Sequence, residues 1–444
     1  RSGKLPWALA PGAEARPHRD ASTPVSPALS DLIEAELGAL DPRDPQFAVQ
    51  AVERLLAAGR RLGASDLHLQ PTATGLEMRF RVDGVLQPAG VLAASVAANV
   101  TARLKVLADL LTYRTDIPQE GRIRRAEGGE PETRPGARLG PPETEVEMRV
   151  STFPTLFGER TVVRFFAGAR RYQRLDDLGL PADVLEPLRR LLGETSGAIL
   201  ATGPAGSGKT TTVYACLREL AERVGSGRSL VSLEDPIEVA VPGVAQSQVN
   251  PAAGFDLATG LRFLMRQDPE VIMVGEIRDR PTAEAAFQAS LTGHLMLSTF
   301  HAGSAAEAIS RLCDLGIEPY LLRSGVLGIL CQRLARRLCG CCRPSDDPDA
   351  RLGLPVEQVR VPVGCAACGG TGYQGRLVLV EMLTAQRSDV GRAILSRSDT
   401  ATLERLAVEA GMVSRWQRAY EALRAGLTSP QEIRRVLGFS DRPA

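Results

Sequence analysis

The chain has 444 residues, enough for roughly two to four domains, and its 44% hydrophobic and 24% charged content is that of an ordinary globular protein. Its 53 Lys and Arg residues almost balance its 52 Asp and Glu residues, so no overall charge attracts the chain to nucleic acid or anionic lipid. Aromatic residues make up 4% of the sequence, which argues against a base-stacking platform, and no apolar run approaches the ~18 residues of a membrane-spanning helix.

The N-terminal segment, residues 1–46, is rich in Pro, Ala and Ser, which predicts a disordered tail or linker with one short helix around Leu29–Leu40. It contains no apolar core followed by a small-residue cleavage site. We therefore expect a cytoplasmic protein.

Residues 47–170 are expected to form a small α+β domain. Apolar residues recur at helical spacing from Phe47 to Gly63, and alternation then predicts two strands around a turn at Asp83-Gly84. A further helix, an exposed loop at 126–145 and two more strands complete this domain.

Strand-like and helical runs alternate over residues 178–335, which predicts an α/β domain with a parallel, doubly wound sheet. An element that contains most of the cysteines follows at 336–380, and a helical region at 381–444 ends the chain.

A glycine-rich motif lies between the first strand and the first helix of the α/β domain. The stretch Gly203–Thr210 fits the pattern G-x-x-x-x-G-K-[ST], whose glycines let main-chain N–H groups face phosphate oxygens at the start of a helix. Lys209 would reach the β- and γ-phosphates of ATP, and the Thr210 hydroxyl would bind Mg²⁺. The alternative is a glycine-rich turn without a ligand. The predicted nucleotide-binding residues are Gly203, Pro204, Ala205, Gly206, Ser207, Gly208, Lys209, Thr210 and Thr211.

Two acids end predicted strands of the same sheet. Glu276 follows the run VIMVG, where it would act through the Mg²⁺ shell, or else cap the next helix. Glu234 ends the run SLVSLE, where it would polarise the attacking water as a general base, or else form a turn before Pro236. Together with Lys209, these acids are the predicted catalytic residues.

Two histidines, His294 and His301, bracket the strand-like run LMLSTF. A lone histidine is more often a structural residue, and the two are too far apart along a strand to resemble a metal pair. Their alternative role is to donate hydrogen bonds to the γ-phosphate.

Two C-x₂-C pairs, Cys339/Cys342 and Cys365/Cys368, are separated by 22 residues. Tetrahedral zinc takes four thiolates, so the pattern predicts a structural zinc site on these four cysteines, with a reduced, metal-free cluster as the alternative. Cys341 could replace Cys342. The remaining cysteines, Cys216, Cys313 and Cys331, are expected to be buried apolar side chains.

Taken together, these motifs make the chain resemble the secretion ATPases of type II secretion systems and type IV pilus assembly, which are RecA-like P-loop proteins. The resemblance covers residues ~47–440. It rests on the stretches SDLHLQP, RFRVDGVL, IPQEGRI, RVSTFPTLFGER, GPAGSGKTTTVY, SLEDPIE, RQDPEVIMVGEIRD, TGHLMLSTFHAGSA, QRLARRLC and GCAACGGTGYQGR.

The resemblance implies a homo-hexamer whose active sites lie between a PAS-like N-terminal domain and a RecA-like domain. It also implies that Glu234 is the catalytic acid, that Glu276 is the Walker B acid and that the histidines belong to a histidine box. Arginines of the N-terminal domain would reach the nucleotide; Arg149 and Arg164 match best, followed by Arg122 and Arg160. The cysteine element is typical of assembly-type rather than retraction-type motors.

The sequence thus predicts an ATPase with ATP, Mg²⁺ and Zn²⁺ as cofactors, peripheral at the inner membrane through platform and adaptor proteins and without direct nucleic-acid contact. It would drive assembly of a pseudopilus for type II secretion; pilus extension or DNA uptake is the first alternative. A nucleic-acid motor and a nucleotide-binding scaffold are further alternatives. The loop 126–145 looks longer than in the family, the stretch after His301 is less polar, and a family N-terminal domain that binds the platform is missing or truncated.

Overall fold

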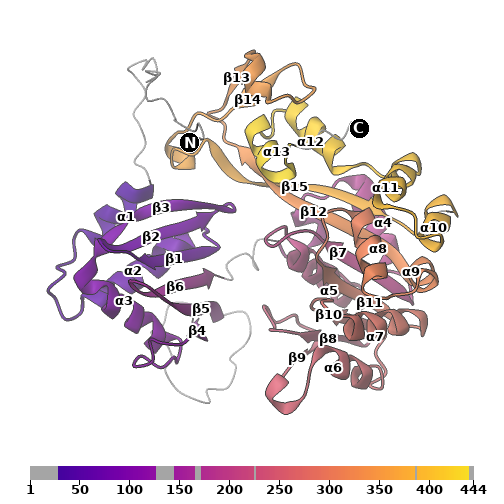
Figure 1. Cartoon of the computed structure of the whole chain (residues 1–444), viewed down its shortest axis with the longest axis horizontal. Coiled ribbons are helices and arrows are strands. Elements are labelled where there is room, and N and C mark those ends of the chain that lie inside the picture. The colour runs from indigo at the N-terminus through magenta and orange to yellow at the C-terminus, as the bar shows by residue number, and fades with distance from the viewer. Residues whose placement is uncertain (1–28, 127–144, 166–171, 225–226, 386–387, 440–444) are drawn as a thin grey trace, which may run out of the picture.

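The computed structural model describes residues 29–126, 145–165, 172–224, 227–385 and 388–439. These residues form an N-terminal unit, residues 29–165, and a C-terminal unit, residues 172–439, each built on its own sheet (Figure 1).

The N-terminal unit is a six-stranded antiparallel sheet in the order β3-β2-β1-β6-β5-β4, packed with three helices. Alternate residues of its strands are buried against the helices, as expected for a sheet with one covered face. The predicted α+β architecture is therefore present. The elements are α1 (Leu29–Leu37), α2 (Phe47–Arg61), β1 (Asp66–Pro71), β2 (Gly75–Val82), β3 (Val85–Ala93), α3 (Ala94–Leu107), β4 (Gln119–Ala126), β5 (Glu145–Thr155) and β6 (Gly158–Phe165).

Helix α1 belongs to the core of this unit. Its Leu29, Ile33 and Leu37 recur at helical spacing and are buried, and the helix packs on β3. The short helix expected around Leu29–Leu40 is therefore present as α1, but it belongs to the core of this unit and not to a disordered tail. Residues 1–28 of the expected tail lie outside the described residues.

The C-terminal unit contains a seven-stranded sheet in the order β15-β12-β7-β11-β10-β8-β9. All neighbouring strands are parallel except β12 and β15, so the predicted parallel sheet is confirmed. Its strands are β7 (Gly197–Thr202), β8 (Leu230–Glu234), β9 (Ala245–Gln248), β10 (Val271–Val274), β11 (Leu295–Phe300), β12 (Val326–Leu338) and β15 (Tyr373–Leu383).

Both faces of this sheet are covered. Ala198 and Leu200 of β7 belong to one hydrophobic core, and Ile199 and Ala201 belong to the other, because successive side chains of a strand point to opposite faces. The helices are α4 (Ala182–Leu191), α5 (Lys209–Val224), α6 (Leu257–Leu264), α7 (Arg280–Leu291), α8 (Ala305–Asp314), α9 (Pro319–Gly325), α10 (Ser388–Leu395), α11 (Thr400–Glu409), α12 (Arg415–Arg424) and α13 (Pro430–Leu437).

The cysteine element is an excursion between two strands of the large sheet. Residues 339–372 lie between β12 and β15 and carry the short hairpin β13 (Arg343–Ser345) and β14 (Val359–Val361). Val359 shares a small core with Leu379 of β15, Ala419 of α12 and Ile433 of α13. Residues at both ends of the predicted 336–380 element therefore belong to the sheet.

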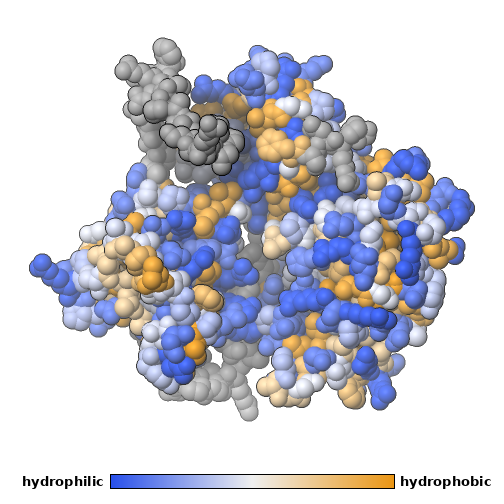
Figure 2. Space-filling view, viewed as in Figure 1, coloured by the Kyte–Doolittle hydropathy of each residue, from blue (hydrophilic) through white to orange (hydrophobic). Residues whose placement is uncertain are grey.

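On the face drawn in Figure 2, hydrophilic residues are interspersed with smaller groups of hydrophobic ones. Within the described residues, no helix combines the length and apolar character needed to cross a bilayer.

Candidate functional site

The glycine-rich motif forms the turn from β7 into α5. Gly203, Gly206 and Gly208 have φ of +142°, +73° and +91°, values that side-chain-bearing residues rarely adopt. A Cβ on Gly203 would lie 2.5 Å from the Gln332 carbonyl oxygen and from Ser207 Oγ. The turn thus requires glycine at the positions where the sequence places it.

The Lys209 side chain folds back and forms hydrogen bonds within this turn. Its Nζ donates to the carbonyl oxygens of Gly203, at 2.9 Å, and of Pro204, at 3.0 Å. Burial lowers the pKa of Lys209; the negative charge of Glu276 raises it and the positive charge of Arg333 lowers it further. The Glu276 carboxylate, 67 residues further along the sequence, therefore acts electrostatically on the Lys209 ammonium.

The donor set of the turn fits a phosphate group. Ser207 is buried, and its Oγ has no hydrogen-bond partner among the described residues. The helix that starts at Lys209 offers unsatisfied N–H groups and its positive dipole end. A buried hydroxyl without a partner is costly, so a bound anion would supply the missing acceptor. Thr210 and Thr211 follow in the first turn of α5, both half-buried.

Glu276 is held between two basic side chains. Its Oε1 lies 2.9 Å from Nε2 of His301, and its Oε2 lies 2.7 Å from Nε of Arg278. Asp279, not Glu276, caps α7 by accepting the Thr282 N–H, which removes the capping alternative. A cavity of about 530 Å³ opens beside Glu276 and His301.

Glu234 is buried at the end of β8 and accepts hydrogen bonds from three side chains. Ser232 Oγ donates to its Oε1 at 2.6 Å, Gln246 Nε2 donates to the same oxygen at 3.0 Å, and the Tyr214 hydroxyl donates to Oε2. This carboxylate is thus fixed in a network rather than exposed in a turn.

The two histidines lie at opposite edges of the sheet. His301 follows β11 and reaches Glu276, whereas His294 precedes β11, where its carbonyl accepts the Gly197 N–H at the start of β7. Strands β7 and β11 are parallel, so His294 is a whole strand, about 20 Å, from the glycine-rich turn. The prediction of His294 as a phosphate donor is therefore wrong; its ring contacts the Ala289 carbonyl at 3.1 Å.

The predicted arginines form a row across the N-terminal sheet. Arg122 of β4 is paired in register with Arg149 of β5, and Arg149 with Arg164 of β6. Glu120 forms an ion pair with Arg149, and Asp66 with Arg164 at 3.0 Å. Arg160 lies on the same strand, beside His68 at 3.3 Å.

This row faces the segment that follows Glu234. Arg122 Nη2 donates to Gln248 Oε1 at 3.3 Å, and the same oxygen accepts the Ile237 N–H. Desolvation and the charge of Glu234 raise the pKa of Glu238, and the charges of Arg164 and Arg149 oppose that rise. The arginine row and Glu234 are therefore brought to the same segment.

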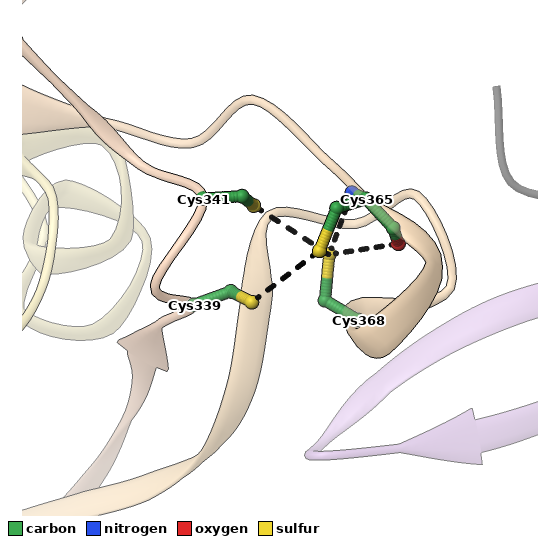
Figure 3. Close-up of side chains that lie close together, drawn as sticks. All are labelled: Cys339, Cys341, Cys365 and Cys368. Atoms are coloured by element: carbon green, nitrogen blue, oxygen red, sulfur yellow. Dashed lines mark hydrogen bonds between the residues drawn. The ribbon is translucent and has the colours of Figure 1, made fainter. Parts of the chain in front are cut away.

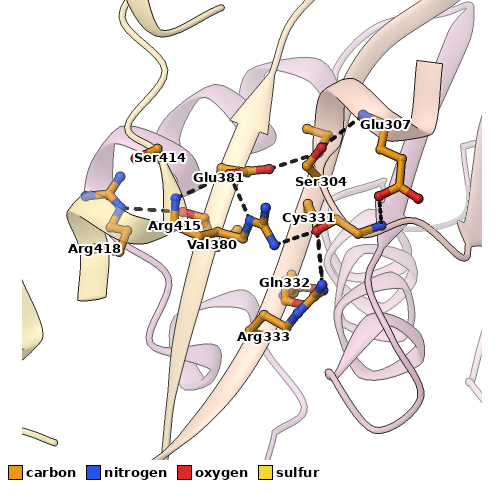
Figure 4. A network of polar contacts seen from close by, with 12 residues as sticks. Ser304, Glu307, Cys331, Gln332, Arg333, Val380, Glu381, Ser414, Arg415 and Arg418 are labelled. Atoms are coloured by element: carbon orange, nitrogen blue, oxygen red, sulfur yellow. Dashed lines mark hydrogen bonds and ion pairs between the residues drawn. The ribbon is translucent and has the colours of Figure 1, made fainter. Parts of the chain in front are cut away.

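A buried ionic network holds the loop after His301 (Figure 4). Glu381 of β15 accepts the Ala305 N–H at 2.9 Å and forms an ion pair with Arg415 at 2.9 Å. Arg333 of β12 donates to the Gly303 carbonyl at 3.0 Å. The positive charge of Arg333 also lowers the pKa of Lys209 in the glycine-rich turn.

Four cysteines converge at the end of β12 (Figure 3). The Sγ atoms of Cys339, Cys341, Cys365 and Cys368 all lie within 4.8 Å of one another, with Cys339–Cys365 at 3.7 Å and Cys341–Cys368 at 4.0 Å. Sulfurs at ~2.3 Å from a tetrahedral zinc are about 3.8 Å apart, so the cluster fits a zinc site. Burial raises the pKa of Cys368, but N–H groups of Cys365 and Gly372 outweigh it and bring that pKa to about 7.

The cluster contains Cys341 in place of the predicted Cys342. The N–H of Cys342 donates to the Cys339 carbonyl at 3.0 Å, and this turn brings Cys341 to Cys368 while Cys342 leads into β13. The C-x₂-C spacing in the sequence did not show that Cys341, and not Cys342, joins the cluster. Outside the cluster, Cys216 and Cys331 are buried and Cys313 is half-buried.

The partners of Glu234 were not predicted. Tyr214 and Ser232 lie in the same motifs as Lys209 and Glu234, so their positions in sequence offered a signal. Gln246 and Gln248 offered none, because their roles depend on the pairing of β9 with β8.

The chain shows clear similarity to known proteins. A family model described as type II/IV secretion system protein matches residues 42–435. The type II secretion system protein HxcR of Pseudomonas aeruginosa is 38% identical over 408 residues, which cover 92% of this chain and 81% of that protein. The type IV pilus assembly ATPase PilB of Thermus thermophilus is 35% identical over 400 residues, which cover 88% of this chain and 43% of that protein.

Solved structures are similar in fold. The ATPase DotB of Legionella pneumophila has a TM-score of 0.61 at 21% identity, over 89% of this chain and 96% of that chain. Because the family model spans most of the sequence and HxcR is matched over most of its length, the chain belongs to the family of type II/IV secretion system proteins.

Proposed function

We propose that this chain is the ATPase motor of a type II secretion system, a homo-hexamer that drives assembly of a pseudopilus for protein secretion. The observation that carries this proposal is the glycine-rich turn that leads from β7 into α5 at Lys209, in a chain of this family. The name of HxcR, a type II secretion system protein, supports the choice of machine.

In this proposal the turn from Gly203 to Thr211 holds the phosphates of ATP, with Lys209 at the β- and γ-phosphates. When bound, Mg²⁺ neutralises charge on the phosphates, and Thr210 and Glu276 are the residues that would hold it and its water shell. Glu234 accepts a proton from the attacking water. His301 keeps Glu276 in place, supported by its 2.9 Å contact.

Arg149 and Arg164 would stabilise negative charge on the transferring phosphoryl group when the two units close. Their charges act on Glu238, in the segment that follows Glu234, which supports this role. The cluster of Cys339, Cys341, Cys365 and Cys368 would hold a structural zinc ion, because four thiolates leave no open position for chemistry.

The proposed motor is cytoplasmic and peripheral at the inner membrane, where platform and adaptor proteins anchor it. Similarity to PilB favours one second candidate, a motor for pilus extension or for a DNA-uptake pilus. A nucleic-acid translocase is disfavoured by the balance of 53 basic and 52 acidic residues.

Phosphate release from ATP tests the proposed activity. We expect turnover by the wild-type chain, loss of turnover in Lys209→Ala, and no stimulation by duplex DNA. Stimulation by DNA that falls steeply with salt would instead favour the translocase. Equal turnover by the wild type and Lys209→Ala would overturn the assignment of the site. Co-purification with the platform protein of a secretion or a pilus system would decide between the two machines.

A further inference from the structure

Three side chains from three different elements meet at the Glu234 carboxylate. Tyr214 comes from α5, the helix that starts at the glycine-rich turn; Ser232 comes from β8 itself; Gln246 comes from the edge strand β9. Tyr214, Ser232 and Glu234 are all buried, with exposed fractions of 3%, 0% and 2%. Polar groups in such a place are expensive unless each is paired.

Two of the three donors, Gln246 and Tyr214, are themselves fixed by further hydrogen bonds. Gln246 Oε1 accepts the Val241 N–H at 2.6 Å, so its Nε2 is the atom that donates to Glu234 and to the Val239 carbonyl. The Tyr214 hydroxyl accepts the Glu238 N–H at 3.2 Å, which leaves its single proton for Glu234 Oε2. Burial and the charge of Glu234 raise the pKa of Tyr214, so the phenol keeps that proton.

The arrangement distinguishes the two oxygens of the carboxylate. A carboxylate offers about four acceptor positions. Oε1 accepts from Ser232 and Gln246, and Oε2 accepts from Tyr214 alone, among the hydrogen bonds formed within the described residues. One acceptor position on Oε2 therefore remains for a water molecule.

We propose that Tyr214, Ser232 and Gln246 are positioning residues that hold the Glu234 carboxylate in place and aim its Oε2 at the attacking water. This rests on the proposed role of Glu234. In the step, Oε2 takes a proton from the water while the water oxygen bonds to the γ-phosphorus, and the bond from that phosphorus to the bridging oxygen breaks to release ADP.

The Tyr214 hydroxyl also joins the carboxylate to the segment that faces the arginine row. Its acceptor side holds the main chain at Glu238, next to Ile237, whose N–H shares Gln248 Oε1 with Arg122. A shift of this segment would move the hydroxyl. The position of the Glu234 carboxylate therefore depends on the segment of the C-terminal unit that Arg122 of the N-terminal unit contacts.

Tyr214→Phe tests this proposal because it removes one hydroxyl and keeps the ring. Tyr373→Phe is the matched control, since its hydroxyl is also buried, contacts Ser429 at 2.6 Å and lies beside the cysteine element. The measurement is the single-turnover rate of ATP hydrolysis with enzyme in excess, from pH 5 to 9, together with the dissociation constant of a fluorescent ATP analogue.

We expect the plateau rate of Tyr214→Phe to fall about tenfold, because an aimed base contributes much of the chemical step. The dissociation constant should change less than about twofold, since Tyr214 holds no phosphate.

Ser232→Ala removes a second donor to the same carboxylate without changing α5, so its single-turnover rate must also fall while its dissociation constant changes less than about twofold. Single-turnover rates in Tyr214→Phe and Ser232→Ala equal to that of Tyr373→Phe would overturn the proposal. That result would leave the proposed function intact if Lys209→Ala is still inactive, so the two failures are distinguishable.

Discussion

Nε2 of His301 lies 2.9 Å from Oε1 of Glu276, although 25 residues separate them in the sequence. The contact exists because β10 and β11 are parallel neighbours, so the residues that follow them share one edge of the sheet. The sequence does not distinguish His294 from His301, but in the structure His301 is the one that contacts Glu276.

His301→Ala should lower turnover at saturating ATP by about tenfold, because Glu276 would lose one of the two groups that hold it. His294→Ala is the control, since His294 lies at the opposite edge of the sheet, and it should retain wild-type turnover. Phosphate release measures both. Equal losses in the two variants would contradict the distinction between the histidines.

Cys341→Ser should remove zinc from the protein, whereas Cys342→Ser should keep one equivalent. The reason is that Sγ of Cys341 lies 4.0 Å from Sγ of Cys368, inside the four-sulfur cluster, and Cys342 leads away into β13. Metal analysis of both purified variants by mass spectrometry tests this. Zinc retained in Cys341→Ser and lost in Cys342→Ser would contradict this and support Cys342 as the zinc ligand, as the C-x₂-C spacing predicted.

Lys105→Met should destabilise the N-terminal unit by about 3–5 kcal/mol, because it leaves Glu159 buried without its partner. The Lys105 ammonium and the Glu159 carboxylate are 2.8 Å apart, with side chains 1% and 7% exposed. We expect the midpoint of thermal unfolding to fall by roughly 10 °C. The double variant Lys105→Met with Glu159→Met should recover most of this loss, and a further loss would contradict the account.

The sequence was most informative where one local motif determines geometry. The glycines from Gly203 to Gly208 require a particular backbone, and the apolar runs of β7, β10 and β11 require burial on both sides, so the turn and the sheet were predictable. The spacing of two cysteine pairs likewise predicted the cluster, apart from one member.

The remainder depends on contacts between distant segments. Whether Cys341 or Cys342 joins the cluster depends on a turn closed by the Cys339 carbonyl, and a one-residue difference in spacing cannot reveal it. The roles of Gln246 and Gln248 depend on the register of β9 with β8. The prediction for His294 was wrong because the two histidines lie at opposite ends of β11. Only the end that shares a sheet edge with the glycine-rich turn can reach the phosphates.

The stability of the C-terminal helices should depend on acid pH through Glu432. Burial raises the pKa of this carboxyl, but hydrogen bonds from Arg435 and Arg336 outweigh it and hold the pKa below its ordinary value. A depressed folded-state pKa contributes stability that is complete above the unfolded value, about 4.3, and is lost as pH falls through the folded value.

Glu432→Gln should therefore lower the unfolding temperature at pH 7, and its deficit relative to the wild type should shrink below about pH 4. Glu409→Gln is the control, because Glu409 forms an exposed pair with Arg405 that contributes little. Calorimetry across this pH range checks both variants. A deficit that grows toward low pH would contradict the sign of the shift.

Lys209 can be tested as the phosphate contact by chemical labelling, because the sequence contains lysine only at positions 4, 105 and 209. An acyl phosphate of ATP transfers its acyl group to an amine that lies beside the terminal phosphate, and peptide mass spectrometry then identifies the lysine. We predict acylation of Lys209 that excess ATP suppresses. Acylation confined to Lys4 or Lys105, or labelling of Lys209 that ATP does not suppress, would contradict the nucleotide site on which the motor function depends.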